Sequence, residues 1–362
     1  MSNELNRKIS VSLVFFWMFI SILKLIFFKT DTTRLGLEVF TVDLFFWGLS
    51  LLIILNYTIL VGTVIPKKVF VVLAFLFGAS IAFNYKIAII VYLLVLWISI
   101  AKLISRKDFE KIYLVSYVFC FVYIVFSVAL NGQNYFYDNR YGYIPSFGFL
   151  NPNSFAQLIT IFYIFLARKF IYSILLSFFL YISFKDVIFS RSFYFILMLQ
   201  PLLFLIFNFI PQKAFSLIPV FVFIFSLILA LSLTSEYGAL LDSMFSGRGY
   251  YSSLLLGELD SVGKIIFGVI DNVDDIPVDI SFVSVLYNYG LCVVLIILYL
   301  YGKGLNIIYA KKETGLNVII ISFFAYCLVE NTLVSYFLNF TLYYIFSVLF
   351  VRSSKNNFSN NG

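Results

Sequence analysis

Long apolar runs dominate this sequence and leave few folds open to it. The first, ISVSLVFFWMFISILKLIFF at 9–28, carries a single charged residue. A run of about 18 or more apolar residues is long enough to cross a bilayer as a helix. Charged residues make up only 12% of the chain, about half the fraction usual in soluble domains. Most of the chain is therefore expected to lie in a membrane.

We predict an all-α polytopic membrane protein with about twelve spans, forming a single integral membrane domain over 1–362. Helices are expected because lipid leaves no partner for unpaired backbone groups. The predicted spans are 9–28, 39–60, 69–84, 87–104, 112–130, 153–167, 170–184, 188–210, 214–233, 281–301, 316–336 and 338–351. Arg7 and Lys8 precede the first run and no small-residue cleavage site follows it, which favours a retained signal anchor.

The basic residues orient these spans. With the N-terminus in the cytoplasm, 16 of the 25 Lys and Arg residues fall in inner segments, as the positive-inside rule requires. Both termini are then cytoplasmic. Two longer loops, 131–152 and 234–280, lie outside; the second is expected to carry short surface helices at 250–259 and 264–270. The polar tail 352–362 is expected to be disordered and cytoplasmic.

The sequence lacks the residues that several classes of protein function require. The chain has no His, and its three Cys lie singly in apolar runs, so no metal site, cofactor or disulfide is indicated. It has no P-loop, dinucleotide fingerprint, HExxH or nucleophile elbow. The net charge of +7 arises in short loops between spans and does not indicate nucleic-acid binding.

Three arginines lie on the predicted outer side: Arg140, Arg191 and Arg248. The planar guanidinium suits phosphate oxygens, so the three are candidates to bind a lipid-linked diphosphate. The alternative is interfacial anchoring, because Arg side chains near span ends snorkel to headgroups.

Two short stretches accompany these arginines. Asn151 and Asn153 flank Pro152 at a helix start, where Asn is a good N-cap and Pro suits the first position. Around Arg248, the sequence SGRG (Ser246, Gly247 and Gly249) suits close backbone approach and an anion nest. An ordinary turn that starts a surface helix explains it equally well.

The acids and aromatics leave further alternatives open. Glu330 falls within the predicted span 316–336, and an intramembrane carboxylate is a functional candidate unless an arginine pairs with it. Lys24 and Asp43 lie at similar depth and are expected to form a structural ion pair. Tyr141 and Tyr143 belong to a tyrosine-rich loop that serves either as a membrane belt or to stack on sugar rings; the other two tyrosines are Tyr135 and Tyr137.

In order along the chain, R140-YGYIPSFGFLNPN-S154, SRS at 190–192, SGRG at 246–249 and NYG at 288–290 resemble the motifs of the Wzy-type oligosaccharide repeat-unit polymerases. This family belongs to the superfamily that includes the O-antigen ligases. The resemblance covers about 130–300 as motif and the whole chain as topology.

The resemblance implies a GT-C-like, metal-independent glycosyltransferase in the bacterial cytoplasmic (inner) membrane. It would polymerise undecaprenyl-diphosphate-linked repeat units into capsule, exopolysaccharide or O-antigen, with a flippase and a chain-length regulator as partners. Arg140, Arg191 and Arg248 would neutralise the diphosphate leaving group. Because the ligase branch uses a His that this chain lacks, Glu258 or Asp279 is the favoured base, ahead of Glu330.

Two other functions fit the same features. A lipid-linked oligosaccharide flippase also has about twelve spans, but transporters place polar residues and broken helices at the membrane midplane, whereas the charges here collect at the outer face. An O-antigen ligase-type transferase shares the site and differs in its acceptor.

Overall fold

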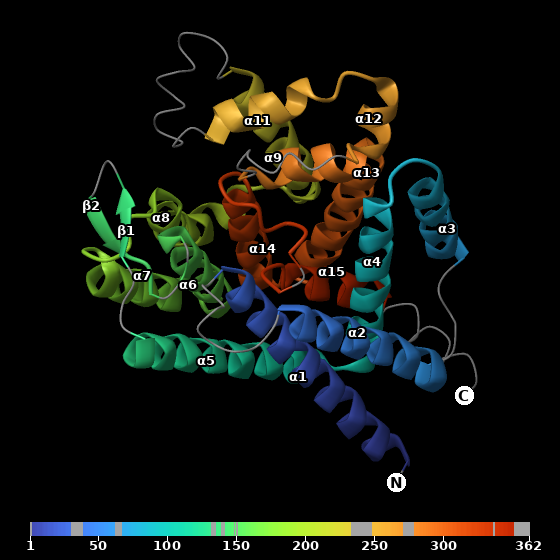
Figure 1. Cartoon of the computed structure of the whole chain (residues 1–362), viewed down its shortest axis with the longest axis horizontal. Helices are drawn as coiled ribbons and strands as arrows, with labels where there is room; N and C mark the ends of the chain where they lie inside the picture. Colours follow the sequence, from blue (N-terminus) through green and yellow to red (C-terminus); the bar gives the residue numbers. More distant parts are fainter. Residues whose placement is uncertain are drawn as a thin grey trace. The chain divides into compact units, whose positions relative to one another are not determined.

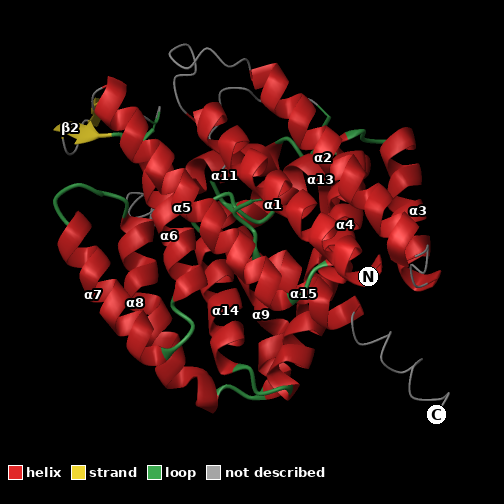
Figure 2. Ribbon diagram, turned by 90° about the horizontal axis from the view of Figure 1, so that it is seen from below, coloured by secondary structure: helices red, strands yellow, loops and turns green. Residues whose placement is uncertain are grey.

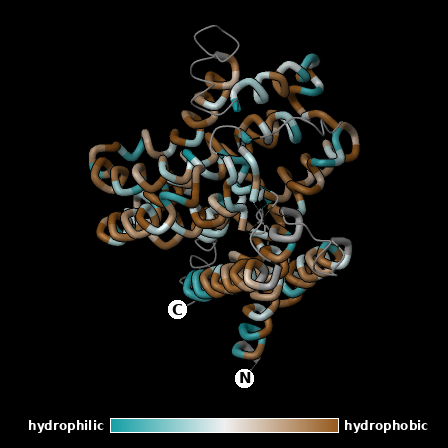
Figure 3. Tube along the Cα trace, turned by 60° about the vertical axis from the view of Figure 1, so that its left-hand side comes forward, coloured by the Kyte–Doolittle hydropathy of each residue, from teal (hydrophilic) through white to brown (hydrophobic). Residues whose placement is uncertain are grey.

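The computed structural model describes residues 2–29, 39–61, 67–131, 135–138, 142–147, 149, 151–232, 248–270, 279–335 and 337–350. Nearly all of them are helical, with one small strand pair (Figure 2). Most of the described residues are hydrophobic, with shorter hydrophilic stretches between them (Figure 3). The described part of the chain is thus an all-α protein of membrane-like composition, as predicted.

Seven described helices are long and apolar enough to cross a membrane: Glu4–Leu25, Thr41–Leu60, Lys86–Leu103, Arg106–Phe126, Arg191–Phe209, Gln212–Leu231 and Ser281–Ala310. The five other predicted spans also coincide with apolar helices, but these have only 10–17 residues. A multi-pass membrane protein follows from the seven. The count of twelve spans stays a prediction.

The chain divides into two compact units, 1–63 with 96–202 and 350–362, and 64–95 with 203–349. The helices of the first unit are α1 (Ser2–Lys29), α2 (Val39–Val61), the second half of α4 (Lys86–Leu103), α5 (Arg106–Asn131), α6 (Pro152–Leu166), α7 (Phe170–Phe184) and most of α8 (Arg191–Ile206). Its strands are β1 (Tyr135–Asp138) and β2 (Gly142–Pro145). The second unit has α3 (Lys67–Ala82), the start of α4, the 3₁₀ turn Phe207–Phe209, α9 (Gln212–Ser232), α11 (Arg248–Gly257), α12 (Val262–Phe267), α13 (Ser281–Ala310), α14 (Thr314–Cys327) and α15 (Thr341–Phe350).

Aromatic side chains fill the core of the first unit, where α1 packs against α2 and α5. Trp17 is fully buried, lies edge-on to Trp97 with ring centroids 5.7 Å apart, and donates its indole N–H to Ser50 at 2.8 Å. Such pairs satisfy the polar edge of a buried indole. The predicted ion pair is confirmed, since Lys24 Nζ lies 2.8 Å from Asp43.

A break in α13 organises the second unit. Gly290 has φ 79° and ψ 174°, a conformation open to glycine alone. It separates an arm, 281–289, from a straight segment, 291–310, whose 20 residues extend for about 30 Å, the thickness of the hydrocarbon core. The chain turns at this break, and α11 and α12 lie beside the arm (Figure 1).

The end of α14 corrects one predicted boundary. The helix was expected to continue to 336, but α14 ends at Cys327, and the described residues 328–335 and 337–340 are not helical before α15 begins at Thr341. Polar partners make this irregular backbone tolerable: Ser281 Oγ accepts the Thr332 N–H at 2.9 Å, and Asn339 donates its amide to the Leu333 carbonyl. Backbone of this kind is stable at membrane depth only when protein surrounds it.

Two sets of hydrogen bonds within the second unit join chain segments that are predicted to lie near the same membrane face. Asn84 lies at the predicted outer end of 69–84 and donates to the carbonyls of Phe267, in the predicted outer loop 234–280, and of Asn288, in the outer half of the predicted span 281–301. At the opposite end, Gln212 donates to Asn306 at 2.7 Å, and both are predicted to be inner. These hydrogen bonds therefore join segments that were expected to lie near the same membrane face. Which face is cytoplasmic stays a prediction.

Candidate functional site

The candidate site is a group of three charged side chains in the second unit. Arg248 Nη2 donates to Glu330 Oε1 at 2.9 Å, and Arg248 Nε lies 3.3 Å from Asp279 Oδ2. Arg248 Nη1 also donates to the Val329 carbonyl. The side chains of Arg248 and Glu330 are 14% and 9% exposed, whereas Asp279 is 37% exposed. One arginine thus has a buried acidic partner and an accessible one.

Three elements hold this group together. Arg248 is the first residue of α11, which packs on α9 and on the arm of α13 through a buried apolar cluster. The members of that cluster are Ala230, Leu255, Val269, Ile280, Val283 and Tyr287. The arm also holds the segment that carries Glu330, because Ser281 Oγ donates to the Glu330 carbonyl and Asn331 donates to Ser284 at 3.1 Å. Burial of α11 and the arm therefore sets the geometry of the charges.

The charges of the two acids dominate the electrostatics of Arg248. Burial of the guanidinium alone would lower its pKa, but Glu330 and Asp279 outweigh that effect, so the pKa of Arg248 is raised. Arg248 stays protonated at every accessible pH. With two carboxylates and one guanidinium the group carries one net negative charge, which opposes the approach of an anion while both carboxylates stay beside Arg248.

Two glycines allow α12 to pack closely against the break in α13. A Cβ at Gly268 would lie 2.7 Å from the Asn288 carbonyl carbon, and one at Gly290 would overlap the Ile266 carbonyl. The Val269 N–H donates to the Tyr287 carbonyl at 2.7 Å across the same junction. The backbones can approach so closely only without side chains.

Two polar side chains from the α3–α4 turn reach the same junction. Asn84 donates at 2.8 and 2.9 Å to carbonyls on α12 and α13, and the buried Lys86 lies 3.3 Å from the Val269 carbonyl and 3.4 Å from Asn288 Oδ1. Lys86 was not among the candidate residues chosen from the sequence. The NYG stretch at 288–290 was the available signal, because it contains both the acceptor and the glycine of the break.

The predicted arginine site is only partly described. Arg140, Tyr141, Ser246 and Gly247 lie outside the described residues. Arg191 begins α8 in the first unit, where it is exposed between Ser190 and Ser192, whose hydroxyls are 2.8 Å apart. The convergence of the three arginines stays a prediction. Arg248 and Gly249 are the first residues of α11, so a helix starts there as both accounts of SGRG allow, and the choice between an anion nest and an ordinary turn stays open.

The remaining predicted residues divide by location. Asp279 lies beside Arg248, whereas Glu258 is exposed beyond the far end of α11, about 15 Å away by helical rise. Glu330, which ranked behind both, has the arginine partner that the structural alternative required. Among the described residues no group of His, Cys, Asp or Glu is arranged to hold a metal ion.

In the first unit, Asn151 caps α6 by accepting the Asn153 N–H at 2.8 Å, which confirms the predicted helix start. Tyr143 is 75% exposed on an antiparallel β-hairpin that the sequence did not predict, with its ring 5.2 Å from that of Tyr137. The two rings form one exposed aromatic face on the hairpin.

Comparisons with protein-family models, with curated proteins and with solved structures each gave no match. Fold and site together define a class: an all-α, multi-pass membrane protein with a buried arginine–glutamate pair at one end of its long helices. The activity of this chain is therefore argued from that site and from the sequence motifs.

Proposed function

We propose that this chain is a Wzy-type glycosyltransferase that polymerises undecaprenyl-diphosphate-linked repeat units into surface polysaccharide at the outer leaflet. The observation that carries the proposal is the Arg248–Asp279–Glu330 group. It joins a phosphate-binding side chain to an accessible carboxylate, in the segment that the basic-residue pattern places outside. The motif resemblance supplies the substrate class.

The different exposures of the two acids suit a two-state role for Arg248. Glu330 is the permanent partner, since it is buried and fixed by the arm of α13. Asp279 is the exchangeable one: its contact to Nε is long and its side chain is accessible. A diphosphate that reaches Nε would replace Asp279 and release that carboxylate next to the reacting sugar.

The released Asp279 would then act as general base. The acceptor hydroxyl attacks the anomeric carbon of the donor, its proton passes to Asp279, and the bond from the anomeric carbon to the phosphate oxygen breaks with inversion. The diphosphate leaves with its negative charge stabilised by Arg248 in a partly dehydrated site. Asp279 suits this role better than Glu258, which lies at the opposite end of α11.

The flippase alternative predicts polar residues and broken helices at the midplane. The structure has such a break at Gly290, inside the apolar helix Ser281–Ala310, but the charged group lies at the start of that helix, beside Ser281. A charged group at the end of the helix, away from its break, favours chemistry at one face over alternating access. The ligase alternative shares the same site and is separated from a polymerase by its acceptor.

Deletion of the chain in its host, followed by analysis of lipid-linked glycans in each leaflet, tests the proposal. We expect single repeat units to accumulate on the outer leaflet while long chains disappear. Accumulation on the inner leaflet would overturn the proposal in favour of a flippase. Long chains that persist on the lipid but are missing from their final acceptor would indicate a ligase.

The site is tested by Arg248→Lys and Asp279→Asn, with Glu258→Gln as the matched control. Chain growth should be lost in the first two at normal protein level, because Lys lacks the fork and Asn cannot take a proton. The control should retain it. Normal chain length in Asp279→Asn would refute the base assignment.

A further inference from the structure

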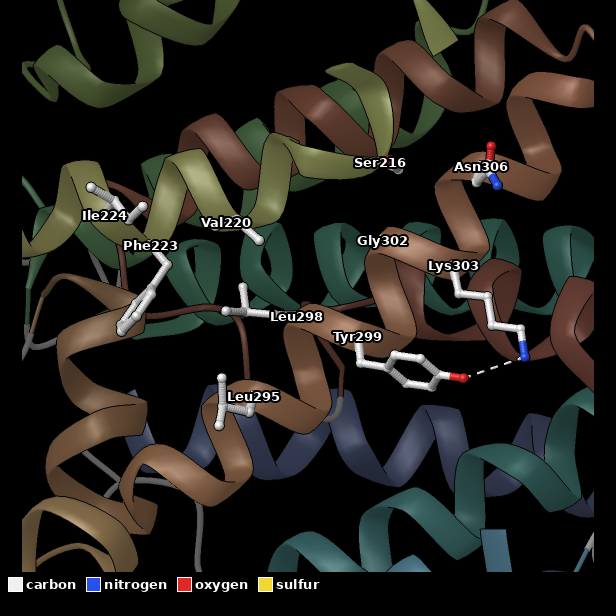
Figure 4. A pocket seen from close by; sticks show the side chains of 10 residues that line it. All are labelled: Ser216, Val220, Phe223, Ile224, Leu295, Leu298, Tyr299, Gly302, Lys303 and Asn306. Carbon is white, nitrogen blue, oxygen red and sulfur yellow. Dashed lines mark hydrogen bonds between the residues drawn. The ribbon is translucent and has the colours of Figure 1, made fainter. Parts of the chain in front are cut away.

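A second feature lies at the other end of α13, away from the charged group. Ten residues of α9 and α13 line an open groove of about 540 Å³ (Figure 4). All ten belong to the second compact unit. Nothing in the proposed polymerisation uses this groove.

The lining changes from polar to apolar along its length. Lys303, Asn306 and Ser216 lie towards one end, and Phe223, Ile224 and Leu295 towards the other (Figure 4). Lys303 Nζ lies 3.5 Å from the Tyr299 hydroxyl. The polar end lies towards the start of α9 and the end of α13, where the predicted spans meet the inner membrane surface.

The groove has the dimensions of one lipid chain in one leaflet. Leu295 and Lys303 are eight residues apart on α13, which corresponds to about 12 Å of helix. Half of the hydrocarbon core is about 15 Å. At Gly302 an added Cβ would lie 2.8 Å from the Ser216 carbonyl, so α9 and α13 approach closely there. This contact forms the floor of the groove, and the larger side chains on either side form its walls.

The charge of the lining selects a headgroup. Lys303 is the single residue among the ten that is charged at neutral pH, and none of the ten is acidic. A basic residue at a membrane surface attracts anionic lipid, and its apolar stem lets it lie along hydrocarbon while the ammonium reaches the phosphate.

We propose that this groove binds an anionic phospholipid of the leaflet at that end. One acyl chain lies between α9 and α13, over Val220, Phe223 and Leu298. The phosphate accepts hydrogen bonds from Lys303 Nζ and from the side-chain amide of Asn306. This places a structural lipid on the face predicted to be cytoplasmic, opposite the charged group at Arg248.

Native mass spectrometry of the purified full chain tests the proposal, with phosphatidylglycerol and phosphatidylcholine of identical acyl chains as probes. We expect one phosphatidylglycerol to bind more tightly than phosphatidylcholine. Lys303→Gln should weaken phosphatidylglycerol about fivefold, the contribution of one basic residue, and leave phosphatidylcholine unchanged. Val220→Trp should fill the groove and weaken both lipids.

Two controls match these variants. Lys311→Gln removes a neighbouring exposed charge outside the groove, and Phe221→Trp places the same indole side chain on the exposed face of α9. Both should bind as the unaltered chain does. Equal binding of the two lipids, or a Lys303→Gln variant indistinguishable from Lys311→Gln, would overturn the proposal. Because Lys303 is exposed, its variant tests the headgroup contact even if Val220→Trp fails to fold.

Discussion

Removing Glu330 should expose how strongly the second unit depends on its buried ion pair. In Glu330→Ala the guanidinium of Arg248 stays 14% exposed and loses its closest carboxylate. Breaking a buried pair by removing one partner costs about 3 to 5 kcal/mol. Arg248 keeps Asp279 and the Val329 carbonyl, so we expect the free energy of unfolding to fall by about 3 kcal/mol, at the lower end of that range.

The assay is unfolding by SDS in mixed micelles, followed by far-UV circular dichroism because all three tryptophans lie in the first unit, with Asp260→Ala as the control. Asp260 pairs with Lys264 on the surface, where the two side chains are 65% and 36% exposed. An exposed pair of this kind contributes less than about 1 kcal/mol, so the control should lose little. Two ion pairs of the same unit thus differ mainly in burial.

A double variant separates the pair from the charge it leaves behind. Arg248→Met with Glu330→Met removes both ions and keeps side-chain volume, a replacement that is often neutral or stabilising. It should therefore be more stable than Glu330→Ala by about 2 kcal/mol or more. If Glu330→Ala were no worse than Asp260→Ala, or if the double variant were the least stable, the reasoning from burial would be refuted.

Three smaller perturbations follow from other contacts. Gly290→Ala should lower the free energy of unfolding by about 3 kcal/mol or more, since a Cβ there combines positive φ with overlap of the Ile266 carbonyl; the same unfolding assay would contradict this with a change below 1 kcal/mol. Asn84→Ala removes two hydrogen bonds to part-buried carbonyls and should cost about 2 kcal/mol, with faster hydrogen exchange at the α12–α13 junction; unchanged exchange would exclude the role. Asn151→Ala removes the cap of α6 and should cost about 1 kcal/mol, whereas Asn153→Ala, whose backbone N–H is the donor, should cost less; equal losses would contradict the capping account.

Local rules predicted the parts of the fold that depend on neighbouring residues. The cap at Asn151 and the Lys24–Asp43 pair needed only helix-start chemistry and a shared depth, and both are confirmed. The length of α14 was different. The run 316–336 is apolar enough to continue a helix, and it ends at Cys327 because Ser281, from a distant part of the chain, supplies hydrogen bonds to the irregular backbone beyond. No pattern within the run contains that information.

The candidate site shows the same division. Sequence reasoning selected Arg248 and Asp279, which the structure brings together, because both lie in the second outer loop, 234–280. Glu330 ranked lower since its partner lies 82 residues away, a separation that spacing rules do not reach. The β-hairpin was missed because Tyr, Asp, Asn and Gly at 135–145 also suit an irregular interfacial loop.

The irregular segment between α14 and α15 has a consequence for the order in which the protein assembles. α15 has ten residues, about 15 Å of helix, too little to enter a bilayer as an independent span. The polar groups of the preceding turn find their partners on α13, where the Tyr301 hydroxyl contacts Asn339 at 3.0 Å and Thr341 at 2.8 Å. α14 and α15 are synthesised after α13, and we expect the two to leave the translocon only once α13 is in the membrane. Insertion of α14 and α15 therefore depends on tertiary contacts with α13. A truncation before 314 should leave α13 in the membrane. A defect in α13 should leave α14 and α15 outside the bilayer.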